Sequence, residues 1–148
     1  WERVWDDPTQ PFRDPADYPP CSVAVSGTHD TEPMAVWWQQ MTDDDRAQVC
    51  TTPTMIRLAD GANLLDAPYN PIVRDALLEA LCASRSDLVL LPVQDVFGSS
   101  DRINVPATVS SANWTYRLPW PVDRLDDVEE VRERTAQLHA WAEQYGRA

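Results

Sequence analysis

The chain has 148 residues, a formal net charge of −12 and a hydrophobic fraction of 43%, and it contains seven Trp. This length supports one domain with a single core, and the apolar content excludes a disordered tail. Nucleic-acid binding normally depends on an excess of cations, so the charge argues against a nucleic-acid partner and fits an uncharged ligand. Because no apolar run approaches the roughly 20 residues that span a bilayer, we expect no membrane partner.

The chain begins at Trp1 rather than at Met, and its first residues lack the basic start and apolar stretch of a signal peptide. We therefore expect further sequence to precede Trp1 in the complete protein. Cys21, Cys50 and Cys82 lie far apart and form no CxxC pair. This pattern favours reduced thiols in a cytoplasmic protein over a disulfide framework or a zinc site.

The first part of the chain is predicted to be a loop followed by a strand and a helix. Residues 6–20 hold five prolines among polar residues, which predicts an extended loop. Residues 22–26 are small or β-branched and end at Gly27, which predicts a buried strand. The polar residues 28–30 then lie between this strand and a helix that we expect Thr31 to cap.

Two further helices are predicted from their first residues. Thr42 precedes three aspartates, and a hydroxyl cap with carboxylates suits the positive end of a helix dipole. The acidic run at residues 43–45 also resembles a metal-binding cluster, although a helix start explains it more simply. Asn70-Pro71 opens a helix whose predicted apolar stripe comprises Ile72, Val73, Ala76, Leu77, Ala80 and Leu81.

The second half of the chain is predicted to hold one strand, a long loop and a last helix. Residues 88–91 form an apolar run that is typical of a strand covered on both faces in a parallel sheet. Residues 98–121 contain Gly and several Pro, so we expect irregular structure there. A helix from about Val122 to Tyr145 should turn its apolar stripe, and Trp141, to a core while its acidic and Arg residues face water.

This order of elements predicts an α/β fold with a parallel sheet. We expect one unit over residues 1–148, with a proline-rich approach loop at 1–20, β/α units and loops at 21–121, and the terminal helix at 122–148. Two strands alone cannot make a stable parallel sheet, because each also needs a neighbour at its outer edge. The chain is therefore interpreted as part of a larger α/β body.

Both predicted strands end in polar residues that include an aspartate. The first is followed by Thr28-His29-Asp30 and the second by Gln94-Asp95. A loop with Arg102, Asn104, Asn113, Trp114 and Arg117 follows the second strand. Carboxylates and amides can hydrogen-bond the vicinal hydroxyls of a sugar, and aromatic rings stack on the apolar face of a pyranose. The sequence thus predicts a sugar site at the carboxyl ends of the strands.

Several motifs in order carry a resemblance to one family. They are residues 26–38, which hold Thr-His-Asp and a paired aromatic; 91–98, with Gln-Asp; 102–109, with Arg-x-Asn-x-Pro; 113–118, with Asn-Trp; and the proline-rich 10–15. Together they resemble the 4-α-glucanotransferases (amylomaltases, or disproportionating enzymes) of glycoside hydrolase family 77. The resemblance covers nearly the whole chain. One departure is Ala107, where many members of the family have Gly.

The resemblance implies the C-terminal portion of a TIM-like (β/α)8 barrel that transfers a segment of an α-1,4-glucan to the 4-hydroxyl of an acceptor. The implied mechanism is a retaining double displacement with two carboxylates. Those two carboxylates belong upstream of Trp1, so the isolated chain is expected to be inactive. The implied partners are α-1,4-glucans and the missing N-terminal part of the same polypeptide. No cofactor or metal is implied.

The resemblance also implies roles for individual residues. Asp30 would stabilise the transition state, while His29 and Asn104 would bind the donor sugar; Trp114 and Asp95 are further candidates for sugar binding. From the residues alone, His29 could instead be a core histidine or a metal ligand, and Asp95 could orient the loop without touching sugar. Trp37 and Trp38 are expected to pack a helix against the barrel. A non-catalytic carbohydrate-binding or structural module is the alternative function.

Overall fold

The computed structural model describes residues 1–9 and 11–147. Gln10 of the predicted proline-rich loop and Ala148, the last residue of the predicted terminal unit, lie outside the described residues. The elements in chain order are η1 (Pro15–Asp17), β1 (Val23–Val25), α1 (Met34–Gln40), α2 (Asp43–Cys50), α3 (Pro53–Ala59), α4 (Pro71–Cys82), β2 (Leu88–Leu90), α5 (Val93–Phe97), η2 (Val122–Asp127) and α6 (Glu129–Gln144).

The sheet consists of β1 and β2, which pair in parallel with Ala24 opposite Val89. The predicted parallel pairing is therefore confirmed. The predicted burial of both strands is wrong, because Val23, Leu88 and Leu90 are 48%, 59% and 61% exposed. Successive side chains of a strand point to opposite faces. One face, which includes the buried Ala24, packs against the helices, while the other is bare in this chain.

The helices before β2 begin largely where their caps predict. The Thr42 hydroxyl accepts a hydrogen bond from the Asp45 amide (3.1 Å), so the acidic run starts α2. The Asn70 side chain likewise accepts from two amides at the start of α4. Helix α3, which begins after Thr52, was not anticipated, although Thr52 followed by Pro at the first position is a helix-start signal. No group of metal-ligating side chains occurs among the residues that the structure describes.

The predicted capping of α1 by Thr31 is wrong. The helix begins at Met34, after Pro33, and no side chain from the preceding residues caps it. The Thr31 hydroxyl instead accepts a hydrogen bond from the Thr28 amide (2.8 Å), which closes the loop on itself. The first amide of α1 takes its acceptor from a distant residue, Asp95, 61 positions along the chain (2.7 Å).

The core lies between α1, α3, α4 and the covered face of the sheet. Trp38 is fully buried and donates its indole N–H to the Ala67 carbonyl (3.0 Å), as packing of this helix requires. Trp37 contacts Trp1 and Phe12. Most of the predicted α4 stripe is buried, but Ile72 is 62% exposed, whereas Val73 in the same first turn is fully buried.

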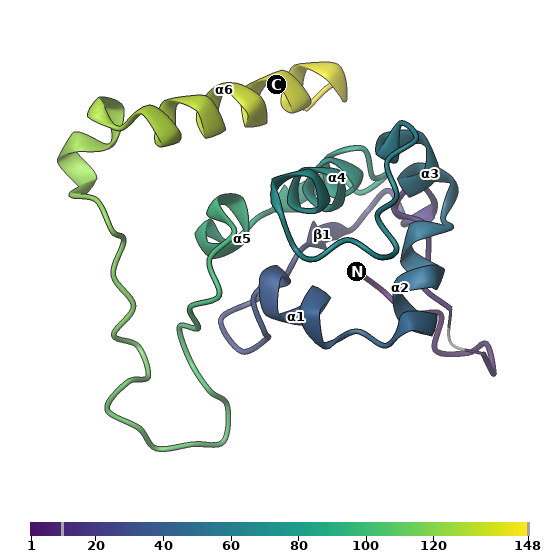
Figure 1. Ribbon diagram of the computed structural model, residues 1–148, viewed down its shortest axis with the longest axis horizontal. Coiled ribbons are helices and arrows are strands. Elements are labelled where there is room, and N and C mark those ends of the chain that lie inside the picture. Colours follow the sequence, from purple (N-terminus) through teal and green to yellow (C-terminus); the bar gives the residue numbers. More distant parts are fainter. Residues whose placement is uncertain (10, 148) are drawn as a thin grey trace.

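The C-terminal region is two helices rather than the single one predicted. The 3₁₀ helix η2 ends at Asp127, and the extended backbone of Val128 separates it from α6. Helix α6 lies above α4 in the view of Figure 1 and buries Trp141, and the hydroxyl of Tyr145, directly after α6, donates to Glu79 (2.7 Å). The prediction that every Arg of this helix faces water is wrong, because Arg134 is buried and pairs with Asp75 (2.9 Å).

Residues 98–121 have no regular secondary structure, as predicted. They leave the helical body after α5, run as a long loop beside α1, and return to η2 (Figure 1). The cysteines are free thiols, with Cys21 exposed and Cys82 buried. No helix within the described ranges is long and apolar enough to cross a membrane.

Candidate active site

The loop between β1 and α1 presents Asp30 to solvent. It starts at Gly27, where an added Cβ would lie 2.8 Å from the Thr31 hydroxyl and 3.7 Å from the Asp95 carboxylate. A side chain at this position would therefore require the Thr31 hydroxyl to move. Further along the loop, the Asp30 side chain is 49% exposed and that of His29 is 51% exposed. Neither residue is buried in the core or used as a helix cap.

The Asp30 carboxylate meets two side chains. One oxygen accepts a hydrogen bond from the Asn104 amide (2.6 Å), although these residues are 74 positions apart. The other oxygen lies 3.3 Å from Nε2 of its neighbour His29. The structure thus brings three of the five predicted site residues together. Carboxylate, amide and imidazole here form one exposed polar group at the carboxyl end of β1.

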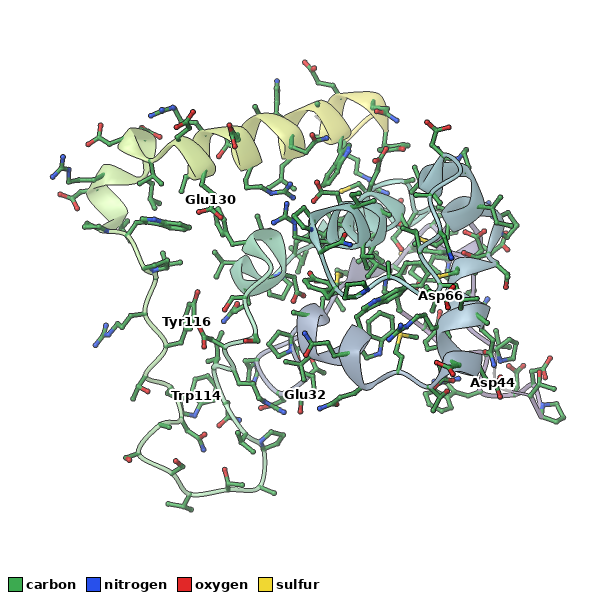
Figure 2. All side chains as sticks on the ribbon, viewed as in Figure 1. Glu32, Asp44, Asp66, Trp114, Tyr116 and Glu130 are labelled. Carbon is green, nitrogen blue, oxygen red and sulfur yellow. The ribbon has the colours of Figure 1, made fainter. Side chains whose placement is uncertain are left out.

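Trp114 adds an aromatic wall to this group. Its ring centre lies 5.1 Å from that of His29, with the planes tilted by 40°, and the residue is 65% exposed. Its backbone has a φ of 64°, in the left-handed region that a bulky residue seldom adopts. The Trp114 amide donates to the Ile103 carbonyl (2.8 Å), which holds this turn. Figure 2 shows Trp114 on the long loop, beside the segment that carries Glu32.

Arg102 and Glu32 join the two segments that form the site. The sequence places Arg102 in the polar loop of the predicted sugar site, but it predicts no contact between Arg102 and Glu32. The Arg102 guanidinium pairs with the Glu32 carboxylate and also donates to the Asp30 carbonyl (3.0 Å). Its Nε donates to the Asn104 carbonyl (3.1 Å). The spacing of Arg102 and Asn104 in their motif was visible in the sequence, but no local signal in the sequence pairs Arg102 with Glu32.

Asp95 lies apart from the Asp30 group and is 1% exposed. One carboxylate oxygen accepts from the Ser26 hydroxyl (2.5 Å) and the other from the Met34 amide (2.7 Å). Burial raises the pKa of Asp95, and these two hydrogen bonds oppose that rise. The cavity of about 30 Å³ that Asp95 lines together with His29 and Arg102 has room for water but not for a pyranose ring.

The exposed group has the chemistry of a sugar subsite. Asp30 offers hydrogen-bond acceptors beside the donors of Asn104, and Trp114 offers a flat apolar surface. A carboxylate can also stabilise positive charge that develops on a sugar ring.

Comparison with known proteins gives a consistent family. A model of the family described as 4-alpha-glucanotransferase matches residues 1–123. The 4-alpha-glucanotransferase of Chlamydia muridarum is 29% identical over 145 residues, which cover 93% of this chain and 26% of that protein. The enzyme of Chlamydia pneumoniae is 30% identical over 128 residues, which cover 80% of this chain and 22% of that protein. A chloroplastic or amyloplastic relative from Solanum tuberosum is 27% identical over 66% of the chain.

The structural comparison agrees. An amylomaltase from Streptococcus agalactiae, solved in complex with acarbose, superposes with a TM-score of 0.67 and 25% sequence identity. The match covers 90% of this chain and 23% of that one, so the chain spans about a quarter of the length of these relatives. Since the family model covers most of the chain, the protein belongs to the 4-alpha-glucanotransferase family of glycoside hydrolases, family 77.

Proposed function

We propose that this chain is the C-terminal portion of a TIM-like (β/α)8 barrel that acts as a 4-α-glucanotransferase. The bare face of the sheet supports the barrel, because Val23, Leu88 and Leu90 are apolar and exposed where a closed barrel would bury them. The outer edges of β1 and β2 are also without strand neighbours among the described residues. The upstream portion of the barrel is the partner that would cover this surface. We call the two portions together the complete barrel.

The observation that carries the proposed activity is the exposed Asp30 carboxylate held between Asn104 and His29. In a retaining mechanism, a carboxylate nucleophile attacks the anomeric carbon while a carboxylic acid protonates the departing 4-oxygen. The acceptor 4-hydroxyl then attacks the glycosyl-enzyme. It loses its proton to the group that first acted as the acid, which is now a carboxylate, and the nucleophile leaves. The two reacting carboxylates are assigned to the upstream portion, about 5–5.5 Å apart.

Asp30 is assigned to stabilising the oxocarbenium-like transition state. Positive charge develops on the ring in each displacement, and a fixed carboxylate beside it binds that state more strongly than the ground state. Asn104 and His29 would hydrogen-bond the hydroxyls of the donor sugar at the same subsite, and Trp114 would stack against a ring. The substrates are α-1,4-glucans, which are uncharged and need no cationic groups in the binding surface.

Asp95 is assigned to positioning rather than to sugar contact. Both of its oxygens already accept hydrogen bonds, and the cavity beside it excludes a pyranose. Of the two roles that the sequence left open, orientation of the loop fits its burial. A cytoplasmic location is proposed as well, since the three free thiols suit a reducing compartment.

The test is disproportionation of maltotriose by this chain alone and by the complete barrel. We expect glucose and longer maltooligosaccharides only from the complete barrel, whether the two portions are joined or mixed. Glucan binding without transfer in the complete barrel would instead support the alternative, a carbohydrate-binding module derived from the barrel.

A further inference from the structure

We propose that Arg102 and Glu32 form a positioning pair that sets the distance between Asp30 and Asn104. This inference rests on the proposed function, because it concerns the same sugar subsite. Neither residue has to touch substrate for it to hold. The pair would fix two loops that have no regular secondary structure to fix them.

The geometry of one guanidinium carries the argument. Its Nη2 donates to the Asp30 carbonyl (3.0 Å), its Nε donates to the Asn104 carbonyl (3.1 Å), and its Nη1 pairs with Glu32. The planar group therefore holds the backbone of both residues whose side chains meet. A flexible ammonium cannot present three donors in one fixed plane, so Lys cannot replace Arg here.

The loop that carries Asn104 depends on this contact. Among the described residues, three hydrogen bonds link residues 98–121 to residues 27–33. Two of them come from Arg102, and the third is the Asn104–Asp30 bond itself. Removing the guanidinium would leave that hydrogen bond and the ring contact between His29 and Trp114 to hold the two segments in register.

Arg102 does not use the Asp30 carboxylate as its acceptor, so the contact does not compete with substrate for that group. Arg102 bonds the main-chain carbonyl of Asp30, and its charge is matched by Glu32. The side chains of Arg102 and Glu32 are 22% and 35% exposed, so water screens the pair only in part. Glu32 thus keeps the cation from neutralising the carboxylate that is assigned to the transition state.

The kinetic test uses the complete barrel with Arg102→Gln, Arg102→Lys and Glu32→Gln. A shift of about 1 Å in a catalytic group can cost about 10²-fold in rate, so we expect kcat to fall roughly 10- to 100-fold in Arg102→Gln with KM changed less than about threefold. Arg102→Lys should retain only part of kcat. The control is Arg124→Gln, which removes an exposed ion pair with Asp127 and should leave kcat unchanged.

A second measurement does not depend on activity. Hydrogen exchange of the Thr28, Asp30 and Thr31 amides, which are bonded within the loop, should accelerate in Arg102→Gln while exchange in α4 stays as in the parent. An Arg102→Gln variant with kcat within about twofold of the parent, or with unchanged exchange in this loop, overturns the inference. Faster exchange throughout α4 overturns it too, because the residue would then support the whole fold. If the parent barrel transfers no glucan, the proposed function fails while the exchange result still decides the geometry.

Discussion

The two strands of the sheet are each followed by an aspartate, and the two aspartates have opposite surroundings. Asp30, five residues after the end of β1, is half-exposed and meets the side chain of Asn104. Asp95, five residues after the end of β2, is buried and serves Ser26 and the first amide of α1. The same pattern in the sequence, an aspartate after an apolar strand, therefore gives a candidate functional carboxylate at Asp30 and a structural one at Asp95.

The difference comes from the segment that connects each strand to its next helix. After β1 the chain passes through Gly27 and forms an exposed loop, with a turn at residues 29–30, before α1 begins. After β2 the chain enters α5 within three residues, and this short helix turns Asp95 inward. Asp95 then holds both ends of the Asp30 loop, since Ser26 precedes the loop and Met34 comes directly after it. The buried Asp95 therefore fixes the two ends of the loop that carries the exposed Asp30.

The largest expected effect is on kcat when Asp30, the candidate functional aspartate, is substituted. In the complete barrel, Asp30→Asn should lower kcat by about 10²–10³-fold, because the amide cannot stabilise developing positive charge. The melting temperature should move by no more than about 2 °C, since the side chain is exposed and its loss leaves no buried group unpaired. Turnover of maltotriose and a thermal melt measure the two quantities. Near-normal turnover would refute the assignment.

The opposite pattern is expected when Asp95 is truncated. Asp95→Ala leaves the buried Met34 amide and the partly buried Ser26 hydroxyl without their acceptors. Two such groups should lower the free energy of unfolding by about 2–3 kcal/mol. Urea denaturation of the complete barrel measures this loss. Asp126→Ala, at an exposed aspartate, is the control and should stay within about 0.5 kcal/mol of the parent. An Asp95→Ala variant as stable as the parent would contradict the role of Asp95 in fixing the ends of the Asp30 loop.

The pH dependence of stability tests the burial of Asp95. Its pKa is raised from the ordinary value of 3.8, chiefly by burial. A raised pKa in the folded state means that the contribution of the group to stability is full below its unfolded pKa and is lost as the pH rises through the folded pKa. The parent should therefore gain stability relative to the non-titrating Asp95→Asn variant as the pH falls from about 7 towards 4, by at most about 1.4 kcal/mol per pH unit.

Paired urea titrations of the parent and Asp95→Asn at each pH give this difference, and the other titrating groups cancel in it. If the parent instead loses stability relative to the variant on acidification, the hydrogen bonds from Ser26 and Met34 outweigh burial. Asp95 would then be held as a stabilised anion.

The sequence was most informative where a residue acts locally. The caps at Thr42 and Asn70 and the irregular loop at residues 98–121 all come from short-range rules, while the parallel pairing of the two strands came from the order of the predicted elements. It failed where one residue depends on another far along the chain. Thr31 was the local choice to cap α1, but Asp95 supplies the acceptor from 61 positions away. Likewise, Arg134 fits a solvated helix face until α4 places Asp75 beside it.

The candidate site divides in the same way. The motifs and the family resemblance pointed to His29, Asp30, Asn104 and Trp114, which the structure places together. The Arg102–Glu32 contact lay outside this reasoning, because nothing within either segment fixes their partnership. Strand burial was overestimated for a related reason. Leu88 and Leu90 have the pattern of strands covered on both faces, but this chain covers only one.

The smallest effect concerns the exposed loop, where strain can be separated from the fold. Ala107 has a φ of 59°, a left-handed conformation that costs a non-glycine residue about 1–2 kcal/mol. Ala107→Gly removes this strain but gives the unfolded chain more conformational freedom, so we expect the free energy of unfolding to rise by about 0.5 kcal/mol with kcat unchanged.

Ala112→Gly is the matched control in the same loop. Its φ is not positive, so the same change should destabilise the protein by a few tenths of a kcal/mol, roughly. Hydrogen exchange across residues 103–115 would show the two changes with opposite sign. Equal effects would mean that the left-handed turn stores no strain.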